Sequence, residues 1–98
     1  MDKKYFALKL NPSRPDFAQT MTAEERSIMQ QHVGYWMGYM ARGKVLVFGP
    51  VLDPAAVYGL GIIVVDDESE VKEMIAKDPA ATINIYEYHP MRAVVPAK

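Results

Sequence analysis

The sequence predicts a single α+β domain in which four β-strands are combined with two helices. Three observations support this prediction. Four segments carry apolar residues at every second position or in short continuous runs, as strands do. Two other segments begin with residues that favour helix N-termini and continue with apolar residues at helical spacing. The chain has 98 residues, which suits one domain rather than two, so we assign residues 1–98 to one domain.

The first predicted strand covers residues 5–10, because Phe6, Leu8 and Leu10 fall on one face by the period of two. Residues 11–15 end this strand, since they contain two prolines. Each proline lacks an amide donor and has a fixed φ, so this segment is predicted to be a loop.

The first helix is predicted from Thr22 to about Arg42. Thr22 and Glu25 have the spacing of a capping box, in which each side chain binds the other residue's amide. Gly43 is a natural residue for the helix end. One stripe of this helix is apolar apart from a single histidine. It consists of Ile28, His32, Tyr35, Trp36 and Tyr39.

Two further strands are predicted at residues 44–52 and 58–65, joined by a connection of hairpin length. Gly49 and Pro50 interrupt the first of them, which favours an edge position or a β-bulge. The second is apolar on both faces at its end, which is typical of a covered central strand.

The acidic residues 66–70 favour the start of a second helix, and Asp78 with Pro79 ends it. Residues 82–88 alternate as a fourth strand, and the tail 91–98 is interpreted as an arm or an extra edge strand. The stripe of the second helix that we expect to be buried consists of Val71, Met74 and Ile75.

The resulting order is β-α-β-β-α-β, the ferredoxin-like layout. Two right-handed connections then place both helices on one face of an antiparallel sheet. The other face carries apolar residues from the second and third strands, and an apolar face of this size rarely stays in water. A second copy of the chain is the simplest cover, so we expect a face-to-face homodimer.

Composition excludes several classes of function. The formal net charge is −1 and the basic residues are scattered, whereas nucleic-acid binding needs a concentrated positive surface. No apolar stretch is long enough to span a membrane, and the N-terminal one is too short for a signal peptide. The absence of cysteine removes thiol chemistry and fits a reducing compartment, so we expect a cytoplasmic protein.

Two residues are the candidate catalytic groups. His32 lies on the inner stripe of the first helix, and an imidazole titrates near neutrality, so it suits acid–base catalysis. The alternative is a structural role, in which His32 donates a hydrogen bond to a backbone carbonyl. Asp78 ends a helix, where the dipole disfavours a carboxylate, so it either has a dedicated partner or is solvated. These two residues and His89 match no metal-binding spacing, and Gly59 and Gly61 form no phosphate loop, so neither metal nor cofactor is predicted.

Five further residues are candidates for a ligand pocket. Tyr35 and Trp36 flank His32 on the helix, while an interrupted strand often borders a site. A loop arginine could bind a ligand carboxylate, although a solvated arginine is the alternative. The five pocket candidates are Arg14, Tyr35, Trp36, Gly49 and Pro50.

A set of short motifs in a fixed order resembles the YCII-like family over residues 5–92. The motifs are His32 with Tyr35 one turn later, Gly43-Lys44-Val45-Leu46, Gly49-Pro50-Val51, Asp78-Pro79 and Pro90. The resemblance implies a ferredoxin-like fold that forms dimeric α+β barrels across the sheet faces. It also implies a cleft into which His32 and Asp78 project. Many members follow the Asp-Pro pair with an aromatic residue, whereas this chain has Ala80 and Ala81, which predicts a smaller or more open pocket wall.

The resemblance implies that His32 transfers a proton and that Asp78 orients it. One line of the family resembles dehydrochlorinase-type lyases that act on hydroxylated aromatics, and related barrels include muconolactone isomerases. We therefore predict a lyase or isomerase of a small cyclic compound. The alternatives are a non-catalytic ligand-binding or stress-linked module, a dimeric interaction protein without a pocket, and an oxygen-using monooxygenase.

Overall fold

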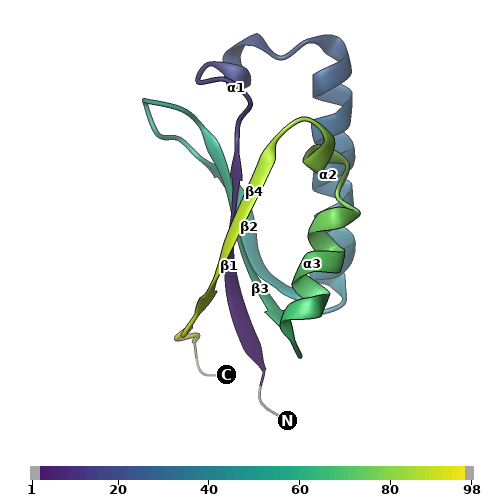
Figure 1. Cartoon of the computed structure of the whole chain (residues 1–98), viewed down its shortest axis with the longest axis vertical. Coiled ribbons are helices and arrows are strands. Elements are labelled where there is room, and N and C mark those ends of the chain that lie inside the picture. The colour runs from purple at the N-terminus through teal and green to yellow at the C-terminus, as the bar shows by residue number, and fades with distance from the viewer. Residues whose placement is uncertain (1–2, 97–98) are drawn as a thin grey trace.

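The computed structural model describes residues 3–96, and it has the predicted β-α-β-β-α-β order with two short helical turns added (Figure 1). Among the described residues the strands form one antiparallel sheet in the order β2-β3-β1-β4. The elements are β1 (Lys4–Asn11), α1 (Phe17–Thr20), α2 (Ala23–Ala41), β2 (Val45–Val51), β3 (Tyr58–Val65), α3 (Glu68–Ala76), the 3₁₀ helix η1 (Pro79–Thr82) and β4 (Ile85–Met91).

The sequence signals at the helix ends act as predicted. The Thr22 side chain accepts from the amide of Glu25, and the Glu25 carboxylate accepts from the amide of Thr22, which completes the capping box of α2. Gly43 follows α2 with a φ of 77°, a conformation that glycine adopts without strain. Asp67 caps α3 by accepting from the amides of Ser69 and Glu70.

Both long helices cover the same face of the sheet, as Figure 1 shows for α2 and α3. The core between the two layers is apolar, and the predicted inner residues of both helices contribute to it. Its buried members are Phe6, Leu8, Trp36, Val45, Ile63, Val65, Val71 and Met74.

The opposite face of the sheet has no helix over it among the described residues (Figure 1). Ile62 on the central strand β3 pairs with Ala7 and Val47, so all three point to this open face. Val47 is 57% exposed, and Ile85, at the start of β4, is 72% exposed. The prediction of an apolar open face is therefore confirmed, while a second subunit upon it stays a prediction.

The fourth strand differs from its prediction. It was expected at residues 82–88, but β4 is Ile85–Met91, and Thr82 belongs to the turn η1. The reason lies in Asp78, whose carboxylate accepts from the Ala80 amide and so caps a short 3₁₀ helix. Residues 92–96 form neither helix nor strand, and the remainder of the predicted tail, residues 97–98, lies outside the described part of the chain.

Candidate functional site

His32 and Asp78 lie in direct contact, although 46 positions separate them in the sequence. His32 comes from the middle of α2, on the face that packs against the sheet. Asp78 comes from the turn between α3 and η1, where its own cap of η1 fixes the backbone. The Nδ1 atom of His32 lies 2.8 Å from Oδ2 of Asp78 and 3.1 Å from Oδ1.

Asp78 is 2% exposed and accepts hydrogen bonds from four directions. Besides His32, the donors are the Trp36 indole at 2.7 Å, the Ala80 amide at 2.9 Å and the Tyr86 hydroxyl. Burial raises the pKa of this carboxyl, but the hydrogen bonds from His32, Tyr86, Trp36 and Ala80 outweigh burial and hold its pKa below the ordinary value. Asp78 is therefore ionised at neutral pH.

The ionised carboxylate sets the tautomer of neutral His32. A carboxylate can only accept, so Nδ1 must carry the proton and donate it to Asp78. The other ring nitrogen, Nε2, is then unprotonated in the neutral ring and lies on the side away from Asp78. His32 lines a cavity, whereas Asp78 does not, and Nε2 is the ring nitrogen that Asp78 leaves free to accept a proton. This arrangement suits a general base.

The cavity has a volume of about 230 Å³ and lies between α2, the loop around α1 and the helix-facing side of the sheet. Gly59 and Gly61 form part of its wall, and they pair with Leu10 and Leu8 on β1. A Cβ on Gly59 would lie 3.2 Å from the Cβ of Leu10, so a larger residue at this position would crowd the neighbouring strand. Polar side chains are few in this wall, namely His32, Trp36, Tyr58, Asn84 and Tyr86.

Three of the five predicted pocket residues line this cavity, namely Trp36, Gly49 and Pro50. Pro50 lies on the edge strand β2, as its missing amide donor requires, and β2 has a register irregularity between Val45 and Val47. Tyr35 does not line the cavity, because its hydroxyl donates to the backbone carbonyl of Met74 at 2.6 Å and faces α3 instead.

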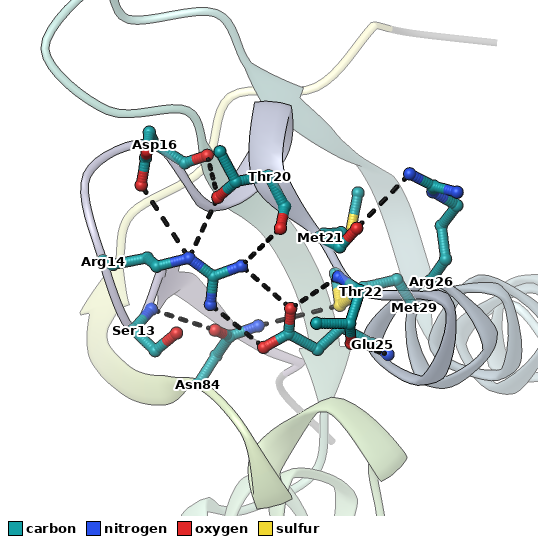
Figure 2. A network of polar contacts seen from close by, with 10 residues as sticks. All are labelled: Ser13, Arg14, Asp16, Thr20, Met21, Thr22, Glu25, Arg26, Met29 and Asn84. Atoms are coloured by element: carbon teal, nitrogen blue, oxygen red, sulfur yellow. Dashed lines mark hydrogen bonds and ion pairs between the residues drawn. The ribbon is translucent and has the colours of Figure 1, made fainter.

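Arg14 also does not line the cavity, because its guanidinium is occupied by protein groups (Figure 2). Two of its nitrogens donate to the carboxylate of Glu25 at 3.0 and 2.9 Å. The third nitrogen, Nε, donates to the side-chain oxygen of Thr20 at 3.0 Å, and Nη2, one of the two that bind Glu25, also donates to the carbonyl of Thr20 at 2.8 Å. The loop that these bonds fasten supplies Phe17 and Met21 to the cavity wall. Arg14 therefore positions the wall rather than meeting the ligand.

The Glu25 carboxylate makes this network sensitive to acid. The hydrogen bonds from Arg14, together with that from the Thr22 amide, lower the pKa of Glu25 from 4.5 to about 2. Its contribution to stability is thus complete above pH 4.5 and is lost as the pH falls toward 2. We expect Glu25→Gln to lower the melting temperature at pH 6, and the difference from the parent to shrink between pH 4.5 and 2.

The matched control is Glu24→Gln, which removes the same charge from the same exposed helical turn without touching Arg14. Melting curves by circular dichroism across this pH range check the prediction. A difference between parent and Glu25→Gln that stays constant down to pH 2 would contradict it.

Sequence reasoning missed two polar residues of the site, Asn84 and Tyr86. Tyr86 lies within the predicted fourth strand, but the strand pattern gives no sign of its contact with Asp78. Asn84 was expected in the same strand, whereas it precedes β4 and is buried. His89 pairs with Ala7 and so faces the open side of the sheet, away from His32.

Within residues 3–96, no three His, Cys, Asp or Glu side chains are grouped closely enough to hold a metal ion. Over the same residues, no helix has the length and apolar character needed to cross a membrane.

Comparisons with known proteins agree with this fold. A family model described as the YCII-related domain matches residues 6–94. A similar solved structure is 5-chloro-2-hydroxyhydroquinone dehydrochlorinase from Burkholderia phenoliruptrix AC1100, in complex with 2,5-dihydroxybenzoquinone. The TM-score is 0.62 at 19% identity, over 91% of this chain and 93% of that chain, which shows a shared fold. No curated protein matches the sequence.

Proposed function

Because the chain belongs to the YCII-related domain family, we propose that it is an enzyme that moves a proton on a small, ring-shaped molecule, as a lyase or isomerase. The observation that carries the proposal is the contact of 2.8 Å between His32 Nδ1 and the buried carboxylate of Asp78. It leaves Nε2 of the same imidazole as a proton acceptor, and His32 lines an apolar cavity. A structural pair would need no cavity beside it.

In this mechanism Nε2 of His32 takes a proton from the bound molecule, while Asp78 holds Nδ1–H and stabilises the imidazolium that forms. The similar solved structure is a dehydrochlorinase, which suggests elimination of hydrogen chloride as the reaction to try first. In that reaction the proton goes to His32 and the electrons of the broken bond form a new double bond. The C–Cl bond breaks and chloride leaves, so no electrons are gained or lost overall.

The volume of the cavity limits the size of the substrate. A cavity of about 150 Å³ holds benzene. The cavity beside His32, at about 230 Å³, therefore accommodates one ring with a few substituents. The exposed residues Val33 and Pro50 belong to its wall, so the cavity reaches the surface and a substrate can enter.

The test is a screen of chlorinated hydroquinones and hydroxyhydroquinones, with chloride release followed by an ion-selective electrode and product by absorbance. Release by the parent protein and its loss in His32→Ala are expected. Equal release by both proteins would sink the proposed mechanism.

A non-catalytic ligand-binding role is the second candidate, and the scarcity of polar groups in the wall favours it. It predicts that the parent protein binds hydroxylated rings without consuming them. Binding without turnover over the whole screen would select this role.

We further propose that the open face of the sheet is covered by a second copy of the chain. Ile62 lies at the centre of this face, between Ala7 and Val47, and Lys9 and Glu87 pair across it. A two-fold contact would bury the apolar centre of both copies at once. A partly polar edge around an apolar centre is typical of interfaces between proteins.

We expect Ile62→Lys to raise the dimer dissociation constant by at least about 100-fold, since it would bury a charge without a partner. The control is Val94→Lys, at a side chain that is 98% exposed and lies outside the sheet. Sedimentation velocity over a range of concentrations measures both variants. A parent protein that sediments as a monomer at high concentration would refute the dimer.

A further inference from the structure

Asn84 is a buried polar residue of the cavity wall for which the mechanism above has no use. Asn84 is only 6% exposed. In the described part of the chain, the other polar residue that is buried is Asp78. Asp78 accepts four hydrogen bonds and faces away from the cavity, whereas Asn84 lines it. An amide in a largely apolar wall needs a reason, because burying polar groups without good partners is costly.

The orientation of the Asn84 amide is fixed by the backbone (Figure 2). Its Oδ1 accepts from the amide of Ser13 at 3.1 Å. Since a backbone N–H only donates, the oxygen must face Ser13, and the NH₂ group must point the other way. Interchanging the two ends would place donor against donor.

The NH₂ group has donor capacity that the protein does not use well. Its nitrogen lies 3.6 Å from the sulfur of Met29. A thioether is a weak acceptor, and an amide nitrogen carries two N–H groups. No stronger acceptor contacts this nitrogen among the residues that the structure describes.

This donor and the proposed base belong to residues of the same cavity wall. Met29 precedes His32 by three residues in α2, so the two side chains occupy neighbouring turns on one face. Met29, His32 and Asn84 all line the same cavity. A molecule that contacts Nε2 of His32 can therefore present a second atom to Nδ2 of Asn84.

We propose that Asn84 determines specificity, with Nδ2–H donating to an acceptor oxygen of the bound ring while His32 takes the proton. This inference rests on the proposed function and names its substrate class: a ring with a carbonyl or phenolate oxygen apart from the reacting atom. A ring without that oxygen leaves the donor unsatisfied, and sites built around such a donor reject analogues that lack its partner.

The test compares two neutral probes of nearly equal size, acetophenone and ethylbenzene, which differ in one carbonyl oxygen. The main variant is Asn84→Asp, because it keeps an oxygen for the Ser13 amide and removes the NH₂ donor. Asn84→Ala removes the donor without adding charge. Gln30→Glu is the control, since it makes the same amide-to-carboxylate change at an exposed position of α2 outside the cavity wall.

Dissociation constants from isothermal titration calorimetry decide the outcome. We expect both Asn84 variants to bind acetophenone about tenfold more weakly, with ethylbenzene changed less than about twofold and Gln30→Glu losing nothing. Equal losses for both probes would mean that Asn84 only shapes the cavity and would overturn the proposal. A loss in Asn84→Asp alone, no loss in either variant, or a parent protein that binds neither probe would overturn it as well.

These measurements use binding alone, so they give an answer even if the turnover screen finds no reaction. Conversely, unchanged affinities in the Asn84 variants would leave the His32 mechanism intact.

Discussion

Replacing His32 with alanine is expected to lower the turnover number for an accepted substrate by about 10²–10⁴-fold. The variant lacks the nitrogen that takes the proton, while the remaining cavity wall still binds the ring. The Michaelis constant is therefore expected to change much less than the turnover number. Steady-state kinetics on the best compound of the chloride-release screen measures both quantities.

The control for this variant is His89→Ala, which removes the other histidine from the open face of the sheet. It is expected to retain parental turnover. If the His32→Ala protein were unfolded, its loss of activity would not support the mechanism. The circular dichroism spectrum of His32→Ala must therefore match that of the parent. A folded His32→Ala protein with parental turnover would contradict the assignment of the base.

Replacing Asp78 with alanine is expected to destabilise the fold by about 3–5 kcal/mol. The change leaves the donors of His32, Trp36 and Tyr86 without their shared acceptor in a buried site. Each unsatisfied buried donor costs on the order of 1–3 kcal/mol, and the costs overlap because the donors share one partner. Urea unfolding followed by tryptophan fluorescence measures the change, since Trp36 is the single tryptophan and is one of these donors.

Asp67→Ala is the matched control, because Asp67 also caps a helix but is exposed. Loss of an exposed cap costs about 1 kcal/mol. Similar losses of unfolding free energy in Asp78→Ala and Asp67→Ala would show that Asp78 acts only as a helix cap. In Asp78→Asn, the ¹⁵N shifts of His32 report the tautomer, and we expect the preference for a proton on Nδ1 to be lost.

The lowered pKa of Asp78 also sets a pH dependence. Its folded-state pKa lies below the ordinary value, so the stability that this carboxylate contributes is complete above about pH 4 and is lost as the pH falls through the folded-state pKa. The free-energy gap between the parent and Asp78→Asn should therefore narrow in acid. A gap that does not depend on pH would count against an ionised Asp78.

Much of the fold could be read from local patterns. The capping box at Thr22, the turn at Gly43 and the alternation in β1 depend on residues close together in the chain, so the sequence identified them without tertiary information. The fourth strand was misplaced by about three residues at its start, because Thr82 is β-branched and continues an alternating pattern. The competing factor was the capping of η1 by Asp78, and a side chain that ends one helix gives little sign that it begins another.

The site could be predicted only in part. His32 stood out as the one polar group in an apolar helical stripe, and Asp78 as a carboxylate at the wrong end of a helix. Their contact joins α2 to the turn after α3, and here the family resemblance supplied what spacing alone could not. Arg14 was predicted to contact a ligand because the neighbouring sequence indicates no partner for its guanidinium. In the fold, Glu25 and Thr20 accept its hydrogen bonds.

Local sequence patterns were thus enough for the element order, the helix caps and the apolar faces, and they singled out His32 and Asp78 as candidates. The packing of distant segments was needed to show that Asp78 is buried and accepts four hydrogen bonds, that Asn84 lines the cavity, and that Arg14 binds Glu25 and Thr20. The physical reason is the separation along the chain between the residues that interact. Secondary structure follows from hydrogen bonds and side-chain periodicity within a few residues, whereas burial and the pairing of polar groups depend on which distant segments the packed core brings together.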